Sequence, residues 1–286
     1  MPGIYESDDI GLILSFPNKI FTDEGTDIVI FDIDQVLLTA RANPFSLVSH
    51  KRSALYERIS GEKRHVKDKF LLYLFISQST DNIALMDQRI PGLIRGLQLK
   101  KIKCMGNTAL DAQLGLTDNF DMARARIKLL REFDISFLES FSDLSEWNFD
   151  TLDRALIKNC PPLFKDGVVF SSLVPKHITQ IELLRKFKHP LKRIAFIDDN
   201  INHLRGMYEA MNEIGVQCYC FCYTKKNTTP LTEYFLPQFL EEEFEHLEGV
   251  IRKVLNDEDV DELFLLGHLK EFILHLRIEE GWRLWK

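Results

Sequence analysis

The chain has 286 residues, of which 45% are hydrophobic and 28% are charged, and its formal net charge is −7. This length suits one large domain, or a domain with an appendage, and the composition is that of a folded globular protein rather than a disordered chain. Because general nucleic-acid binders are usually basic, the acidic balance excludes nucleic acid from the expected partners.

The first residues carry no signal for export by the Sec route. They read MPGIYESDDIGLILSF, with neither a basic start nor a long apolar run. The longest apolar run, near residues 70–76, is far shorter than the ~20 residues that span a bilayer. We therefore expect a soluble chain, and export by a machine that reads other signals stays open.

Short, almost purely apolar runs recur along the chain and predict strands that are buried on both faces, as in a parallel sheet. They cover residues 28–31, 102–105, 168–170, 194–197 and 216–223. Amphipathic helical patterns lie between them, over residues 121–133, 176–187 and 203–214. This alternation predicts an α/β domain with a Rossmann-like, doubly wound parallel sheet.

Two stretches interrupt the alternation, and either is a candidate cap over an active site. Residues 41–98 are helix-like and separate the first two strands, and residues 140–164 form the second interruption. After residue 225 the chain becomes acidic and helical. We expect a catalytic domain over residues 1–225 with a helical cap at about 41–98, followed by a helical C-terminal region over 226–286.

The cysteines do not predict a disulfide scaffold or a zinc site. Their number, five, is odd, and the chain is large. Cys218, Cys220 and Cys222 alternate along a predicted strand, where alternate residues share a face but lie roughly 6–7 Å apart. Such thiols do not converge easily on one zinc ion, so we interpret them as part of a buried strand.

Two pairs of aspartates follow predicted strands directly. Asp32 and Asp34 come after the first strand, and Asp198 and Asp199 come after the strand at residues 194–197. Open α/β sheets bind ligands at the carboxyl ends of their strands, so we expect both pairs to face one crevice. Such carboxylates repel one another unless a cation compensates, and Mg²⁺ prefers hard oxygen ligands and contacts phosphate.

This pattern predicts phosphoryl transfer to a carboxylate. Once a cation neutralises the phosphoryl oxygens, a carboxylate such as Asp32 can attack phosphorus and form an acyl phosphate that water hydrolyses. Asp34 is placed to protonate the leaving oxygen and then to deprotonate the water. The alternative is that these aspartates only cap helices, but two such pairs at two strand ends favour catalysis.

The order of motifs resembles the haloacid dehalogenase (HAD) superfamily of phosphohydrolases. Its first motif, Asp-x-Asp-x-Thr/Val, reads Asp32-Ile33-Asp34-Gln35-Val36 here, and its acidic fourth motif reads Asp198-Asp199. The resemblance implies that Asp32 is the nucleophile and a metal ligand. It also implies that Asp34 is the general acid/base and gives its backbone carbonyl to the metal, and that Asp199 is a direct metal ligand with Asp198 in support.

The second and third motifs match the pattern of the superfamily less closely than the first and fourth. The resemblance nominates Thr108, at the end of a strand, and Lys176, at the start of a helix, to hold the phosphate. A plain helix N-cap is the alternative role for Thr108. For the basic residue, Lys165 is the alternative candidate. The alternative role for Lys176 is a solvated surface position.

Within the superfamily, the chain is most similar to phosphatases of intracellular bacterial pathogens, some of which are secreted effectors that act on protein phosphotyrosine. The resemblance implies a magnesium-dependent phosphatase of protein phosphotyrosine, in the bacterial cytoplasm or delivered to a host cell. A small-molecule phosphatase for nucleotides or sugars, and a HAD-like scaffold that binds membrane or protein partners, remain alternatives. A dehalogenase fits less well, because it has no obvious use for Asp34.

Two further segments are candidate contacts with an anionic membrane surface. Residues 49–69 are rich in lysine and arginine, and residues 259–286 form an amphipathic pattern that ends in tryptophan and basic residues. Solvated or internally packed helices are the alternatives. We assign no catalytic or metal role to the scattered histidines, which are His177, His203, His268 and His275.

Overall fold

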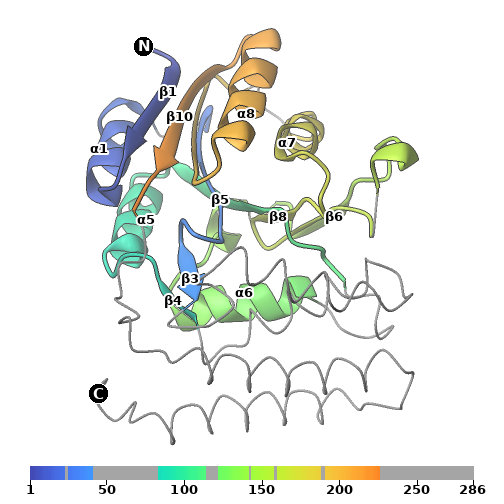
Figure 1. Ribbon diagram of the computed structural model, residues 1–286, viewed down its shortest axis with the longest axis horizontal. Coiled ribbons are helices and arrows are strands. Elements are labelled where there is room, and N and C mark those ends of the chain that lie inside the picture. The colour runs from blue at the N-terminus through green and yellow to red at the C-terminus, as the bar shows by residue number, and fades with distance from the viewer. Residues whose placement is uncertain are drawn as a thin grey trace, which may run out of the picture. The chain divides into compact units, whose positions relative to one another are not determined.

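The computed structural model describes residues 1–22, 25–40, 83–113, 122–141, 143–157, 160–187 and 191–225 (Figure 1). The chain divides into two compact units, one of Met1–Thr39 with Leu85–Asn227 and one of Ala40–Ala84 with Thr228–Lys286. The basic segment 49–69, the C-terminal region 226–286 and most of the expected cap lie outside the described residues. The helix at Ile90–Leu99, which we had included in the cap, belongs to the first unit.

The core of the first unit is an eight-stranded sheet. Its strands, in spatial order, are β1 (Gly3–Ser7), β10 (Gln217–Tyr223), β9 (Arg193–Asp198), β2 (Asp27–Phe31), β5 (Lys103–Thr108), β8 (Val168–Phe170), β7 (Leu163–Lys165) and β6 (Glu146–Asn148). Neighbours from β1 through β8 are parallel, whereas β7 and β6 are antiparallel. A mostly parallel sheet flanked by helices confirms the predicted Rossmann-like α/β fold.

The strand order places a topological switch point between β2 and β9. From β2 the chain proceeds to β5 and β8 on one side, and then crosses to β9 and β10 on the other. The two strands pair in parallel, with Ile28 beside Ile194 and Phe31 beside Ile197. The residues that follow β2 and β9 therefore emerge side by side, at the place where open α/β sheets bind ligands.

Helices cover both faces of the sheet (Figure 1). They are α1 (Ile10–Ile20), α5 (Ile90–Leu99), α6 (Met122–Glu132), α7 (Lys176–Leu184) and α8 (Ile201–Glu213). One core cluster joins Ile30 and Phe196 of the sheet to Leu183 of α7 and Met207 of α8. On the other face, Phe16 of α1 packs against the β10 aromatic residues.

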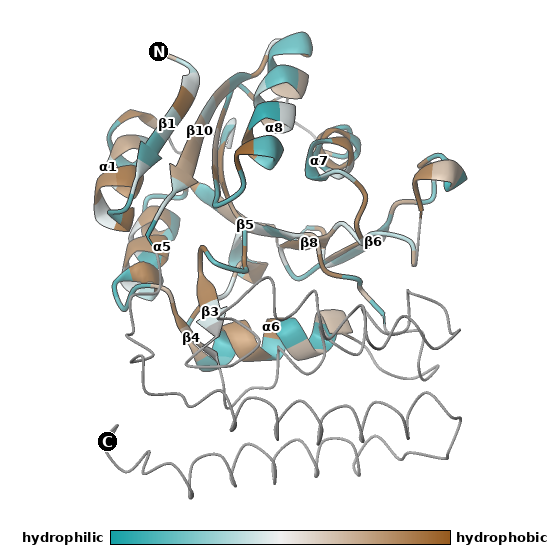
Figure 2. Cartoon of the chain, in the orientation of Figure 1, coloured by the Kyte–Doolittle hydropathy of each residue, from teal (hydrophilic) through white to brown (hydrophobic). Residues whose placement is uncertain are grey.

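Amphipathic patterns account for these helices. Figure 2 shows hydrophobic and hydrophilic residues alternating along α6 and α8, as expected for helices with one buried face. None of the helices in the described part of the chain is long and apolar enough to cross a membrane. As predicted, Cys218 and Cys220 are fully buried within a strand and form no disulfide, although their Sγ atoms lie only 3.5 Å apart.

The second interruption is part of the sheet and not a helical cap. Within residues 143–157 and 160–165, the chain forms β6 and β7, which continue the sheet beyond β8. Trp147 and Phe149 pack together there, with ring centroids 4.3 Å apart. These strands have only three residues each, which is too short for an alternating pattern to predict them.

Candidate active site

The nucleophile predicted from the sequence, Asp32, lies at the switch point directly after β2. Its backbone N–H donates to the Ile197 carbonyl at 2.8 Å, which ties it to β9. Its carboxylate oxygen Oδ1 accepts a hydrogen bond from the Ile33 N–H at 2.7 Å and lies 2.7 Å from Lys176 Nζ. Asp32 is buried. The carboxylate is therefore held in one orientation by its own turn and by one cation.

Lys176 bridges the two aspartate motifs. It is the first residue of α7, and its side chain is only 2% exposed. The ammonium pairs with Asp32 and also with Asp198 Oδ2 at 2.8 Å. Although burial opposes its charge, the two carboxylates hold the pKa of Lys176 above its usual value. Lys165, the alternative candidate, lies on β7 and pairs with Glu146 at 3.4 Å, so the structure brings Lys176 and not Lys165 to Asp32.

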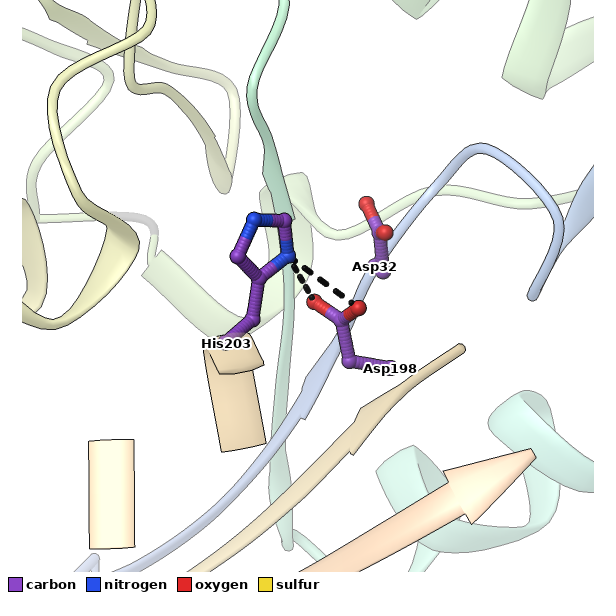
Figure 3. A group of neighbouring side chains, drawn as sticks. All are labelled: Asp32, Asp198 and His203. Atoms are coloured by element: carbon purple, nitrogen blue, oxygen red, sulfur yellow. Dashed lines mark hydrogen bonds and ion pairs between the residues drawn. The ribbon is translucent and has the colours of Figure 1, made fainter. Parts of the chain in front are cut away.

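Asp198, at the end of β9, is fully buried and already well supplied with hydrogen bonds. Oδ1 accepts from the Asn200 N–H at 2.8 Å, and His203 Nδ1 lies 3.2 and 3.1 Å from the two carboxylate oxygens (Figure 3). Burial opposes ionisation, but Lys176 and His203 outweigh it and keep the pKa of Asp198 below its usual value. Both oxygens of Asp198 therefore have partners within the protein.

His203 is a site residue that sequence reasoning missed. We assigned it no role, but Asp32, Asp198 and His203 offer three ligand atoms within 4.8 Å of one another (Figure 3). The signal for it was its place in the first turn of α8, directly after the acidic pair. Its imidazole orients Asp198 and is a possible nitrogen ligand.

Asp199 behaves differently from its neighbour. The residue is exposed, and no described side chain makes a hydrogen bond or ion pair with its carboxylate. The pKa of this carboxyl is nevertheless raised to about 6, because the carboxyl group itself is partly buried and because the charge of Asp198 is adjacent. Asp199 therefore has oxygens available for a cation, which Asp198 does not.

The Asp34 carboxylate contacts side chains from two elements, β5 and α6, that lie far from it in the sequence. Its Oδ2 accepts a hydrogen bond from Thr108 Oγ1 at 3.1 Å, and its Oδ1 lies 3.0 Å from Arg126 Nη2. Thr108, at the end of β5, is buried, and its hydroxyl also accepts from the Leu110 N–H. No helix among the described residues begins at Thr108, so its hydroxyl serves a turn and Asp34 rather than a helix N-cap.

The unusual end of β5, Gly106-Asn107, has a packing explanation. A Cβ on Gly106 would lie 3.3 Å from side-chain atoms of Ile33, Phe137 and Val168, which leaves little room for one. Asn107 is buried and accepts a hydrogen bond from Ser171 Oγ at 3.0 Å. These residues bring β5 close to the turn after Asp32, which places Thr108 beside Asp34.

The charge balance of the site fits a divalent cation. The site has two side chains with fixed positive charge, Lys176 and Arg126. Its carboxylates number four: Asp32, Asp34, Asp198 and Asp199. Burial raises the pKa of Asp32 well above its usual value; Asp198 and Asp34 act in the same direction, and Lys176 only partly opposes them. The Lys176 ammonium therefore leaves the pKa of Asp32 raised, and a bound cation would lower it.

The donor set favours oxygen ligation. Oδ2 of Asp32, the carboxylate of Asp199 and the backbone carbonyl of Asp34 are hard oxygen donors of the kind that Mg²⁺ binds. Including His203 would suit a transition metal better, since imidazole favours softer ions. Among the described residues, the side-chain donors that lie within 4.8 Å of one another are those of Asp32, Asp198 and His203. Asp199 is not in this group, so its role as a metal ligand stays a prediction.

Comparison with known proteins identifies a family for the chain but no activity. No curated protein and no solved structure matches the chain. The model of one family, described as "Protein of unknown function (DUF2608)", matches residues 15–261, which include every residue of the candidate site. The chain belongs to the DUF2608 family.

Proposed function

We propose that this protein is a magnesium-dependent phosphomonoesterase that forms an aspartyl-phosphate intermediate on Asp32. The observation that carries the proposal is the Lys176 ammonium, 2.7 Å from Asp32 and 2.8 Å from Asp198, at the switch point of an α/β sheet. A buried carboxylate beside a fixed cation suits nucleophilic attack on an anionic phosphate ester, since the cation offsets the repulsion between the two anions.

The first half-reaction transfers the phosphoryl group to the protein. A carboxylate oxygen of Asp32 attacks phosphorus and forms a new P–O bond, while the bond from phosphorus to the leaving oxygen breaks. Asp34 gives a proton to that oxygen, so an aryl ester such as phosphotyrosine releases its product as a neutral phenol. Lys176 offsets charge on the phosphoryl oxygens, and the Thr108 hydroxyl turns from Asp34 to donate a hydrogen bond to one of them.

The second half-reaction restores the free protein. Asp34 takes a proton from water, the water oxygen attacks phosphorus, and the bond from phosphorus to Asp32 breaks to release inorganic phosphate. Mg²⁺, held by Asp32, Asp199 and the backbone carbonyl of Asp34, would supply the positive charge that neutralises phosphoryl oxygens in both steps.

Protein phosphotyrosine is the substrate we propose, on the strength of the resemblance to phosphotyrosine phosphatases of the HAD superfamily. A panel of phosphopeptides with phosphotyrosine, phosphoserine or phosphothreonine, measured beside nucleotides and sugar phosphates, separates this substrate from small molecules. Faster turnover of a nucleotide or sugar phosphate than of phosphotyrosine would identify a small molecule as the substrate instead. Binding of anionic vesicles through residues 49–69 or 259–286 stays a prediction, because both segments lie outside the described residues.

The reaction class is tested by hydrolysis of p-nitrophenyl phosphate with Mg²⁺. We expect activity that EDTA abolishes and that Asp32→Asn lowers by roughly 10⁶-fold, the size of the loss when the nucleophile of a covalent mechanism is removed. Asp8→Asn is the matched control, because Asp8 is an exposed carboxylate that follows β1 at the same edge of the sheet. Activity of Asp32→Asn equal to that of the control would refute the mechanism.

A further inference from the structure

Arg126 is a buried arginine whose burial brings little stability. It lies within α6 and is 2% exposed. Its ion pair is with Asp34, whose side chain is 45% exposed, and its Nη1 is buried with no hydrogen-bond partner among the described residues. Burying a guanidinium with one nitrogen unpartnered is costly, and an apolar side chain of similar volume is often as stable or more stable. The charge at this position therefore calls for a functional explanation.

The contact made by Arg126 reaches the acid/base of the proposed reaction. Two donors from two elements hold the Asp34 carboxylate, with Arg126 of α6 on Oδ1 at 3.0 Å and Thr108 of β5 on Oδ2 at 3.1 Å. The backbone is fixed nearby, since Gln35 adopts a positive φ of 65° and its N–H donates to the Leu38 carbonyl at 2.7 Å. The Asp34 carboxylate is thus held by two side-chain contacts next to a fixed backbone turn.

The two contacts are not equivalent during the reaction. Thr108 has one hydroxyl proton, so it cannot donate to Asp34 and to a phosphoryl oxygen at the same time. Arg126 has no competing partner among the described residues, and its guanidinium stays charged at any relevant pH. When substrate binds and Thr108 turns to the phosphate, Arg126 is the contact that remains on Asp34.

We propose that Arg126 is a positioning residue that keeps the Asp34 carboxyl group aligned with the leaving oxygen. This inference rests on the proposed function. Its consequence is specific: loss of Arg126 weakens proton transfer to the leaving group and leaves the nucleophile and the phosphate contacts in place. The defect grows as the leaving group becomes more basic, since a good leaving group departs as an anion without a proton.

The experiment compares two aryl esters with different leaving groups, p-nitrophenyl phosphate and phenyl phosphate, through kcat/KM with Mg²⁺ present. For Arg126→Met we expect kcat/KM to fall by roughly 10- to 100-fold on phenyl phosphate and by only a few-fold on p-nitrophenyl phosphate. The larger loss is a fraction of what general acid catalysis usually contributes to a rate. Arg126→Lys keeps a cation and should recover part of the loss on phenyl phosphate.

Arg131→Met is the matched control. Arg131 lies on the same helix and pairs with Asp166 at 2.8 Å, away from Asp34. We expect it to retain wild-type kcat/KM on both esters. If Arg126→Met does not fold, as judged by circular dichroism, Arg126→Gln, which keeps the side-chain length and a donor, takes its place.

The outcomes separate this inference from the proposed function. If the wild-type protein hydrolyses neither ester, the proposed function fails and the role of Arg126 fails with it. If the wild-type protein hydrolyses both and the Arg126 variant loses the same factor on each, or nothing on either, only the positioning role is overturned.

Discussion

Replacement of Lys176 by methionine tests the electrostatics of the site through stability alone. The change leaves Asp32 and Asp198 buried without the ammonium that lies 2.7 and 2.8 Å from them. Removing one partner from a buried ion pair typically costs about 3–5 kcal/mol, which is a large part of the ~5–15 kcal/mol that stabilises a domain. We expect a loss of this size in the free energy of unfolding at neutral pH, measured without divalent ions.

The loss should depend on pH in a defined direction. Burial already raises the pKa of Asp32 in the folded protein, and we expect loss of the Lys176 charge to raise the pKa of both carboxyls. Such groups favour the folded state below the unfolded pKa, and this contribution is lost as the pH rises through the folded pKa. The Lys176→Met penalty should therefore shrink on acidification, by up to about 1.4 kcal/mol per pH unit for each carboxyl that takes up a proton.

The assay is guanidinium-induced unfolding of both proteins at pH values from about 5 to about 8 in the presence of EDTA. Lys165→Met is the control, because its partner Glu146 is half exposed and such pairs contribute about 1 kcal/mol or less. A Lys176→Met penalty that is the same at every pH, or no larger than that of the control, would refute the electrostatic account.

Two more changes have predictable effects on stability. The pKa of the Asp199 carboxyl is raised to about 6 in the folded protein, so its contribution to stability is lost as the pH rises. In EDTA, the free energy of unfolding of wild type should therefore fall, relative to that of Asp199→Asn, as the pH rises from about 4 to about 6. Because Asp199 is exposed, screening limits this difference to about 1 kcal/mol, and urea titrations at both ends of the range measure it; no difference would contradict the raised pKa. Gly167 has a φ of 83° and a Cβ there would lie 2.5–2.7 Å from Phe137, so Gly167→Ala should destabilise by about 2–4 kcal/mol. Gly96→Ala, within α5 and with open space around it, should instead stabilise by about 0.5–1 kcal/mol, and thermal unfolding of equal effect in both would contradict the packing argument.

Much of the sheet was predictable because its strands are buried on both faces. Runs such as residues 28–31 and 194–197 are apolar without interruption, and they became β2 and β9. Strand β1 was not predicted, since Gly3–Ser7 is short and mixed in character. It forms by pairing in parallel with β10, which lies at the far end of the domain in sequence, and local patterns carry no information about such pairing.

The residues of the candidate site likewise include some that were predicted from the sequence and some that were missed. Asp32 and Lys176 were predicted, because each stands at the boundary of a strongly patterned element, and the structure brings them together. Arg126 was missed because a charged residue in a helix is ordinarily solvent-exposed. It is buried, and its partner Asp34 is 92 residues away in the chain. His203 was missed for a related reason, since its relevance depends on the carboxylate it meets at the end of β9.

The central claim, that Asp32 carries the phosphoryl group, is tested most directly by trapping the intermediate. Wild-type protein is mixed with p-nitrophenyl phosphate and Mg²⁺, quenched in acid, reduced with borohydride and digested for mass spectrometry. Borohydride reduces an aspartyl phosphate to homoserine, so we predict homoserine at position 32, dependent on substrate and absent from Asp32→Asn. Homoserine at another aspartate, or none at position 32 in protein that is turning over substrate and releasing phosphate, would contradict the account.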